Sequence, residues 1–591
     1  MNKHEHRKRV AALQSVMREQ SLDLWVQPVA DEFQGEYVAP YAQRLPWLTG
    51  FSGSAGMGVF WGDSGKKHAL FVDGRYTLQA PQEVDTQTID IINSGDVSFA
   101  EWLKQQISST HREEGIIIGF NPWLHTAQQI RKWQKDAPLG IVFVPANVVD
   151  IAWHDKPSPP QGAVRAHPLA LAGQSTAEKL QTVTTAIREA GADALLVTQP
   201  DAICWLLNIR GSDIPFNPLL LAYLLVRESG EMELFSFQMD VQSINVKISN
   251  INKLWELYER PFTKINKLMI DANDTPYGII LMAEKFGFEV LEKTDPTQLA
   301  KACKNEAELD GMRLAHLRDG LAVSKFLHWF SIQNGVDELG VVAQLETFRR
   351  CVPEYHEPSF ATIAGSGPNG AIVHYRATEI TNRTAQSGEL FLLDSGGQYV
   401  DGTTDITRTM AIGIPSDEMR RNFTLVLKGH IALAAAIFPE GTNGGQLDVL
   451  ARQYLWAAGL DYDHGTGHGV GAHLCVHEGP QRISKRGSDV ALREGMILSN
   501  EPGYYKSDAY GIRIENLVVV VQVGEIANGK KLLGFETLTL APIDRNLVDV
   551  SLLRADERVW LNAYHMRVYQ AHEATLSSEE RTWLREATAQ V

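Results

Sequence analysis

The chain has 591 residues, of which 44% are hydrophobic and 21% are charged, and its formal net charge at pH 7 is −16. This composition is typical of a globular protein with room for three or four domains. The acidic balance argues against nucleic acid or an anionic membrane as a partner, and the apolar runs are shorter than the roughly 20 residues of a membrane span.

The N-terminal segment, residues 1–20, is basic and helical in pattern and lacks the apolar core of a secretory signal. The chain also contains four widely spaced cysteines that form no Cys-x-x-Cys pair: Cys204, Cys303, Cys351 and Cys475. Both observations lead us to expect a reduced, cytoplasmic protein.

The composition along the chain divides it into three expected domains. A Pro-rich linker at residues 156–162 ends a first α/β domain, residues 1–160. A second α/β domain follows at residues 161–302, and a third covers residues 303–591. The last part of the third, from about Gly529, is expected to be a C-terminal extension.

The first two domains are interpreted as related copies. Residues 24–26 (Leu-Trp-Val) have a counterpart at residues 195–197 (Leu-Leu-Val), and residues 47–54 have one at residues 205–212. Neither copy carries a cluster of metal-binding side chains. We therefore expect them to form a scaffold, the rim of a substrate groove and an oligomer surface.

Three long helices are predicted in the third domain from the spacing of its apolar residues. The first is amphipathic and covers Glu306 to Asn334, the second covers Asp417 to Phe438, and the third covers Asp556 to Ala574. The residues with the clearest chemistry lie between the first and the last of these helices.

Two aspartates lie next to short strand-like runs in this region: Asp394 follows one run, and Asp405 precedes another. Asp394 ends the apolar run 390–393, and Asp405 lies eleven residues further on, after a Gly-rich turn. A hairpin centred on residues 399 and 400 would place the two carboxylates directly opposite each other, about 5 Å apart. Like charges at that distance require a cation between them.

Two glutamates repeat the arrangement. Glu501 closes the run 496–500, and Glu515 lies in the return strand after the break at Pro502. The alternation of a strand places Arg513 on the same face as Glu515. A glutamate within so apolar a strand requires a partner charge.

An imidazole completes the set. His468 lies in a Gly-rich segment, residues 464–471, which argues against a helix. We interpret Asp394, Asp405, His468, Glu501 and Glu515 as the ligands of a dinuclear metal site. Four carboxylates and one imidazole favour a harder ion than zinc, so Mn²⁺ is expected first, with Zn²⁺ or Co²⁺ as alternatives, and the soft Cys475 is left out of the set.

The order Asp, Asp, His, Glu, Glu is similar to that of the metallopeptidases with the pita-bread fold. The segments GPNGAIVHY, LLDSGGQYVDGTTDITRT, HGTGHGVG, VHEGP, SNEPGYY and GIRIEN resemble the long, three-domain aminopeptidase P group of that family. The resemblance implies an α/β (α+β) protein with two creatinase-type N-terminal domains, a pita-bread catalytic domain and a C-terminal extension. It also implies a homodimer.

The resemblance assigns roles to individual residues. It makes the five residues above the ligands of two divalent metal ions, makes His374 and His477 catalytic histidines that do not bind metal, and places His464 and Arg513 in the wall of the substrate site. Within this set, Asp394 would bind one metal ion, Asp405 and Glu515 would bridge the two, and His468 and Glu501 would complete the other. Glu501 is also the expected proton carrier.

The implied activity is release of the N-terminal residue from peptides with proline at position two, by attack of a hydroxide held between the two metal ions. Three alternatives are open: prolidase or another pita-bread aminopeptidase, a non-enzymatic binding module on the same fold, and a metal-free creatinase-like hydrolase. The complete ligand set disfavours the last two.

Overall fold

The computed structural model describes residues 3–63, 65–108, 115–241, 244, 246–254, 265–333, 335–487, 489–527 and 529–591. They form two compact units. The first unit extends to Thr297, apart from residues 168–173 and 216–218, which belong with the second. Within the described ranges, none of the helices combines the length and the apolarity needed to cross a lipid bilayer.

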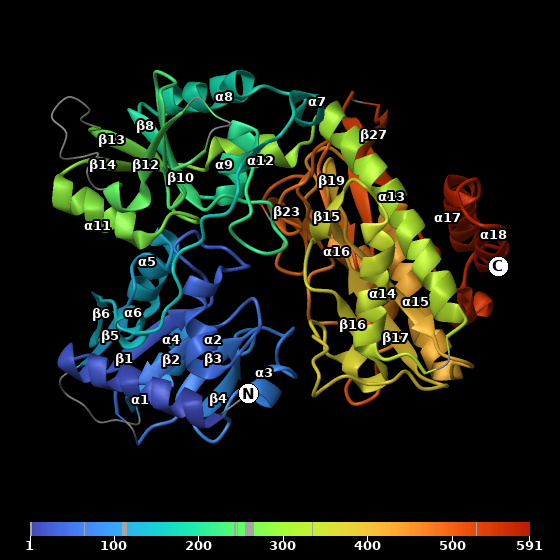
Figure 1. Ribbon diagram of the computed structural model, residues 1–591, viewed down its shortest axis with the longest axis horizontal. Coiled ribbons are helices and arrows are strands. Elements are labelled where there is room, and N and C mark those ends of the chain that lie inside the picture. Colours follow the sequence, from blue (N-terminus) through green and yellow to red (C-terminus); the bar gives the residue numbers. More distant parts are fainter. Residues whose placement is uncertain are drawn as a thin grey trace. The chain divides into compact units, whose positions relative to one another are not determined.

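The first unit contains two six-stranded sheets (Figure 1). The N-terminal sheet has the order β4-β3-β2-β1-β5-β6. Its strands are β1 (Leu24–Pro28), β2 (Met57–Trp61), β3 (His68–Val72), β4 (Ile89–Asn93), β5 (Ile116–Phe120) and β6 (Ile141–Pro145). The second sheet has the order β12-β11-β10-β8-β13-β14. Its strands are β8 (Ala194–Val197), β10 (Ala222–Arg227), β11 (Met232–Ser236), β12 (Lys247–Asn250), β13 (Lys267–Ile270) and β14 (Glu289–Glu292).

The two sheets have the same topology, which confirms the predicted relationship between the two halves. In each sheet the first strand pairs antiparallel with the second and parallel with the fifth. The second and third strands are antiparallel, whereas the third and fourth and the fifth and sixth are parallel. Residues 24–26 and 195–197, which the sequence comparison aligned, lie on equivalent strands, β1 and β8.

The second pair of aligned segments also corresponds in structure. Helix α2 (Arg44–Thr49) ends at Gly50 with φ 80°, and helix α9 (Pro200–Leu207) ends at Asn208 with φ 50°. Both are left-handed C-caps, a conformation that glycine adopts freely and asparagine tolerates. The predicted N-terminal helix is α1 (Lys3–Glu19), which buries Leu13 and Met17, one helical turn apart; Met1 lies outside the described residues.

Helices cover both sheets of this unit and connect their strands. Around the first sheet lie α3 (Ala80–Glu83), α4 (Phe99–Ser108), α5 (Ala127–Asp136) and α6 (Val149–Ala152). Around the second lie α8 (Thr176–Glu189) and α11 (Tyr277–Phe286). Alternation of strands and helices with parallel pairs is the expected signature of an α/β unit.

The second unit begins with α13 (Glu306–Ser331). Its N-cap is a reciprocal capping box in which Asn305 accepts from the amide of Glu308, whose side chain accepts from the amide of Asn305. The predicted end of this helix at Asn334 lies outside the described residues. The helix packs beside α14 (Glu338–Arg350), and α15 (Asp417–Ala434) packs beside α16 (Gly444–Trp456) (Figure 1). Phe438, the predicted end of the second helix, belongs instead to the short strand β21 (Phe438–Pro439).

Among the described residues, the helices of the second unit pack on four antiparallel sheets. Their strand orders are β15-β18-β19, β16-β17-β20, β21-β28-β27-β24-β22-β23 and β25-β26. The remaining strands are β15 (Tyr355–Pro358), β16 (Ile363–Ser366), β17 (Leu390–Ser395), β18 (Gly397–Tyr399), β19 (Gly402–Thr403), β20 (Ile406–Ala411), β22 (Gly467–Gly469), β23 (Glu478–Ile483), β24 (Ile497–Asn500), β25 (Gly503–Lys506), β26 (Tyr510–Arg513), β27 (Asn516–Glu525) and β28 (Lys531–Thr537).

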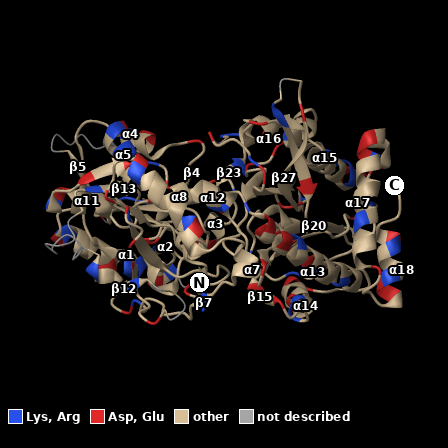
Figure 2. Ribbon diagram, turned by 90° about the horizontal axis from the view of Figure 1, so that it is seen from above, with Lys and Arg blue, Asp and Glu red and all other residues tan. Residues whose placement is uncertain are grey.

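The chain ends in two helices, α17 (Ala555–His572), close to the predicted range, and α18 (Ser578–Ala587). Charged residues of both signs are interspersed along them (Figure 2). A buried guanidinium, that of Arg408 on β20, connects this C-terminal segment to the sheets. It donates to the main-chain oxygens of Thr407, Glu515, Ala541 and Pro542, to Asn516 Oδ1 and to Tyr564 Oη, all at 2.7–2.9 Å.

A buried histidine should make the stability of the second unit depend on pH. The His430 ring on α15 donates from Nδ1 to the carbonyl oxygen of Asn500 and accepts at Nε2 from Asn516 Nδ2, each at 3.1 Å. Burial, and then the charge of Arg408, lowers the pKa of His430 to about 3. The unfolded chain binds this proton near the ordinary pKa of 6.5. The contribution of the neutral His430 ring to the free energy of unfolding is therefore complete above about pH 6.5. It is lost as the pH falls toward 3, at about 1.4 kcal/mol per pH unit.

The test is thermal unfolding of the metal-stripped protein between about pH 6.5 and 4. We expect His430→Gln to flatten the fall of the unfolding temperature with pH, because Gln cannot take up the proton. A slope identical to that of the wild type would contradict the neutral state of the buried ring.

Candidate metal centre

The first pair of acids lies on a hairpin, but the predicted register was wrong by two residues. Asp394 on β17 pairs with Thr407, and Tyr399 pairs with Gly402, so the turn is centred on Val400 and Asp401. Asp405 therefore lies diagonally from Asp394 instead of directly across. A shift of two residues preserves the face of a strand, so both carboxylates remain on the same side.

Contacts from distant elements explain this register. Arg318 on α13 donates to both carboxylate oxygens of Asp401, at 3.0 and 2.7 Å. The amide of Val400 donates to the carbonyl oxygen of Glu354 at 2.9 Å. These bonds hold residues 400 and 401 at the turn, and neither is visible in the local sequence.

Glu501 and Glu515, the second pair of acids, lie opposite each other, as predicted. Asn500 pairs with Asn516 on one side of the break, and Gly503 pairs with Arg513 on the other. The two ladders share one register, which brings Glu501 opposite Glu515 at the interruption between them. Both glutamates thus lie where the ladder opens and their side chains are available for ligands.

His468 lies on β22 and not on a helix, as its glycine neighbours predicted. Its Nδ1 donates to the carbonyl oxygen of Gly469 at 2.9 Å. This bond leaves Nε2 as the nitrogen that faces the acids, 3.4 Å from Asp405 Oδ2 and 3.6 Å from Glu501 Oε1. A backbone carbonyl on the other ring nitrogen is the usual way in which proteins fix a histidine that binds metal.

The described residues contain a group whose donor atoms converge within 4.8 Å of one another: Asp405, His468 and Glu515. Glu501 adjoins this group through His468, and the charge of Asp405 acts on Asp394. The structure therefore brings all five predicted ligands into one place. Their individual roles toward a metal ion stay a prediction.

The electrostatics of the cluster fit divalent cations. Asp394, Asp405 and Glu515 are 8%, 4% and 1% exposed. Burial, and then the neighbouring acids, raises the pKa of Glu515 well above its usual range, and burial raises that of Glu501. Burial also raises the pKa of Asp394 to about 7, against the charge of Arg513. Carboxylates so placed cannot all ionise without a compensating charge.

Three of the four carboxylates accept a hydrogen bond from a protein side chain through one oxygen. Arg513 Nη2 donates to Asp394 Oδ2 at 2.6 Å, Thr407 Oγ1 to Glu515 Oε2 at 2.8 Å, and Ser499 Oγ to Glu501 Oε1 at 3.1 Å. The Oδ1 atoms of Asp394 and Asp405 are buried without a hydrogen-bond partner in the described structure. These orphaned oxygens are suited to bind a metal ion, so the residues present fit such a centre.

The two histidines predicted to be catalytic lie on loops. The ring of His477 makes an edge-on contact with that of His468, with centroids 4.3 Å apart. His374 is half-buried on the turn that follows residues 367–371. The carbonyl of the preceding residue, Val373, accepts from Arg513 at 3.4 Å, which ties this turn to the cluster.

His464 and Arg513, the predicted wall residues, are joined by a tyrosine. Tyr505 Oη contacts His464 Nε2 at 2.9 Å and accepts from Arg513 Nη1 at 2.5 Å. Sequence reasoning missed Tyr505, although it lies within the segment SNEPGYY. It also missed Thr407 and Ser499. The only sequence signal for either residue was that it lies two residues from a predicted ligand, on the same face of the strand.

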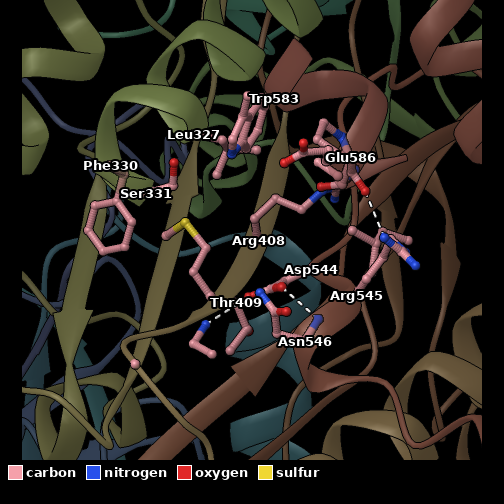
Figure 3. Close-up of a pocket in the computed structure, with 16 residues that line it drawn as sticks. Leu327, Phe330, Ser331, Arg408, Thr409, Asp544, Arg545, Asn546, Trp583 and Glu586 are labelled. Atoms are coloured by element: carbon pink, nitrogen blue, oxygen red, sulfur yellow. Dashed lines mark hydrogen bonds between the residues drawn. The ribbon is translucent and has the colours of Figure 1, made fainter. Parts of the chain in front are cut away.

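A separate cavity of about 440 Å³ lies near the far end of β20 (Figure 3). One of the two acids that line it, Asp544, accepts from the amides of Ala411 and Asn546, each at 2.9 Å. Arg545 donates to main-chain oxygens of α18 and the residues that follow it. Because these groups bond the protein's own backbone, the cavity is not a candidate for the metal centre.

Comparison with known proteins agrees with this geometry. Residues 310–522 match the model of metallopeptidase family M24, and residues 531–591 match the C-terminal region of that family. Residues 9–149 and 155–308 match two models of the creatinase/prolidase N-terminal domain. A curated relative from Coccidioides posadasii, named "Probable Xaa-Pro aminopeptidase P", is 37% identical over 612 residues, which cover 98% of each chain.

Solved structures give the same result. An X-prolyl aminopeptidase from Caenorhabditis elegans, described as a cytosolic enzyme with a di-nuclear active site, has a TM-score of 0.91 and 33% identity, and the match covers 99% of this chain and 100% of that one. An Xaa-Pro dipeptidase from Bacillus anthracis has a TM-score of 0.51 and 26% identity over 63% of this chain and 99% of its own.

The chain belongs to metallopeptidase family M24, and the resemblance inferred from its motifs is confirmed. Its fold, two creatinase-type N-terminal domains followed by a pita-bread catalytic domain with a C-terminal extension, is confirmed as well.

Metal binding should release protons. Burial lowers the pKa of His468, but Asp405 and Glu501 outweigh it and raise the pKa to about 9, so the ring is protonated at pH 7 without metal. The ring must lose that proton before Nε2 can donate to a cation. The apparent affinity for Mn²⁺ should therefore rise between about pH 6 and 9 and then level off.

Calorimetric titration with Mn²⁺ in buffers of different ionisation enthalpy measures this release. Asp405→Ala removes both a predicted ligand and the acid nearest to His468 Nε2, so it should lower the affinity and the number of protons released. Asp544→Asn, a change of a half-buried acid in the other cavity, is the matched control and should bind as the wild type does. A binding heat that is independent of the buffer would contradict the account.

Proposed function

We propose that this protein is an Xaa-Pro aminopeptidase that uses two divalent metal ions to release the N-terminal residue from peptides with proline at position two. The observation that carries the proposal is the convergence of Asp405, His468 and Glu515 donors within 4.8 Å, with Asp394 and Glu501 beside them. The names of the full-length relatives support it.

The five clustered residues would hold the metal ions, with Asp405 and Glu515 between them. When bound, the ions would supply an activated water at neutral pH and polarise the scissile carbonyl. The donor set favours Mn²⁺, because four of its five members are hard carboxylates, while Zn²⁺ and Co²⁺ are the alternatives.

The protein's own groups would move the proton and stabilise charge. Glu501 faces the cluster from the ladder break, where it would take a proton from the attacking water and pass it to the leaving proline nitrogen. His477, in ring contact with His468, and His374 would donate hydrogen bonds to the substrate and to the oxyanion that develops. His464, Tyr505 and Arg513 would form the wall of the substrate site beside the cluster.

Proline imposes a particular form of recognition. An Xaa-Pro bond is a tertiary amide without an N–H group, so the enzyme must recognise the shape of the ring and the geometry of the bond. We place that recognition beside the metal ions, near His374, His477 and Arg513. The free α-amine would lie on the metal side, which limits cleavage to one residue.

The proposal extends to the organisation of the protein. We place the domain boundaries near residues 160 and 302, which the spans of the matching family models support. A homodimer and a cytoplasmic location are part of the same proposal, and the description of the Caenorhabditis elegans structure as a cytosolic enzyme supports the latter.

The two candidate catalytic histidines should be separable from the ligands. We expect His374→Ala and His477→Ala to keep the wild-type metal content and to lose turnover about 10²- to 10³-fold, as is usual when one oxyanion donor is removed. Steady-state kinetics with elemental analysis of the same samples makes the distinction. Loss of metal from either variant would mean that the residue is a ligand.

Substrate choice tests the proposed activity itself. The metal-loaded protein should release one residue from Xaa-Pro-Yaa peptides and longer ones, and it should cleave Xaa-Pro dipeptides less well. A blocked N-terminus should abolish cleavage, and Ala at position two should slow it severely. Mass spectrometry of the products decides: rapid cleavage restricted to dipeptides indicates a prolidase, and equal rates with Ala indicate a general aminopeptidase.

A further inference from the structure

Three charged side chains are buried together beside His477. The side chain of Glu478 is 0% exposed, and those of Lys301 and Lys304 are 4% and 1% exposed. Lys301 Nζ lies 2.7 Å from Glu478 Oε2, and Lys304 Nζ contacts Oε1. Burying three charges is unfavourable, and apolar side chains of the same volume are often as stabilising or more so. We call Lys301, Lys304 and Glu478 the ion triad, and stability alone does not explain why they are buried together.

The backbone at Glu478 shows what the ion triad holds. Strands β22 and β23 pair regularly as far as His468 and Arg482, and the next pair is Gly469 with Glu478. Residues 479–481 therefore form a bulge. Bulges of this kind redirect a strand and re-aim the side chains beside it. Here the bulge brings the ring of His477 to 4.3 Å from that of His468.

The two lysines are themselves fixed in place. Lys301 lies on α12 (Pro296–Ala302), and Lys304 lies between this helix and the capping box of α13. The amide of Lys304 donates to the carbonyl oxygen of Gly495 at 3.0 Å, and Cys303 forms a β-bridge with Met496. Both ammonium groups thus provide a fixed anchor for the carboxylate that follows His477 in the chain.

We infer that Glu478, anchored by Lys301 and Lys304, is a positioning residue that holds His477 in its place beside His468. Glu478 has no contact with the five-residue cluster among the described hydrogen bonds and ion pairs, so it acts through the neighbouring histidine. The inference rests on the proposed catalytic role of His477. A displacement of a catalytic group by about 1 Å can lower a rate about 10²-fold, which sets the size of the expected effect.

The test replaces the whole ion triad. A single change such as Glu478→Gln would leave two buried ammonium groups without a counter-charge, and the variant could fail to fold. The triple variant Lys301→Met, Lys304→Met and Glu478→Met removes all three charges and keeps similar volumes. We expect it to retain the unfolding temperature and metal content of the wild type and to lose about 10²-fold in kcat.

A matched control comes from another buried ion pair of the same unit. Lys428 on α15 and Glu557 on α17 lie 2.5 Å apart, with side chains 9% and 2% exposed. The double variant Lys428→Met and Glu557→Met should leave kcat unchanged. A loss of kcat in this control as well would show a general effect of removing buried charge and would overturn the inference.

The histidine background provides the decisive comparison. If the ion triad acts by placing His477, the triple change should have no further effect on kcat once His477→Ala is present. A further loss of about 10²-fold in kcat in that background would overturn the inference. Wild-type kcat in a stable triple variant would overturn it as well. If the triple variant fails to fold, Lys301→Met, which removes one of the two anchors and leaves a neutral Lys304–Glu478 pair, takes its place. Its kcat should fall by less than that of the triple variant and should not fall further once His477→Ala is present, and wild-type kcat would overturn the inference.

These outcomes are distinct from failure of the proposed function. A metal-loaded wild type that does not cleave Xaa-Pro-Yaa peptides would refute that function and not the anchoring. The distance between the His468 and His477 rings in a crystal structure of the triple variant then decides the anchoring without an activity assay. An unchanged 4.3 Å separation would overturn it.

Discussion

The catalytic unit is organised around one electrostatic constraint: three buried carboxylates and the half-buried Glu501 lie close together, with a single imidazole among them. Such a cluster is unfavourable in isolation, because burial and the neighbouring acids oppose ionisation of Asp394, Glu501 and Glu515. Two antiparallel ladders impose it. In each, a break in regular pairing frees acidic side chains, while hydroxyl and guanidinium donors hold one oxygen of Asp394, Glu501 and Glu515.

Support for the cluster comes from cations and helices far away in the sequence. Arg349 on α14 binds Asp319 on α13 and also donates to Ser395, the residue after Asp394. Arg408 joins the backbone of Glu515 to that of Pro542 in the C-terminal segment. These buried, hydrogen-bonded side chains tie the helices and the C-terminal segment to residues at or next to the predicted ligands. The fold therefore keeps these mutually repelling carboxylates in fixed positions.

The sequence allowed the acids, the imidazole and their strands to be predicted, because turns, apolar runs and residue order are local signals. The repeat of the N-terminal sheets was also visible in the aligned segments, whereas the helix ends at Gly50 and Asn208 within them became apparent only in the structure. The register at Asp394 was not predictable, because Arg318 holds the turn from another helix. The hydroxyls of Thr407 and Ser499 escaped notice for a similar reason, since a strand hydroxyl becomes meaningful only when its partner is known.

We propose that the five donors hold two metal ions and that Asp405 and Glu515 are shared by both. Anomalous diffraction at the manganese edge, from crystals soaked in Mn²⁺, tests it most directly. The account predicts two peaks per chain within the cluster, each contacted by Asp405 and Glu515, with His468 Nε2 on one of them. A single peak, or two peaks that do not share these acids, would contradict it.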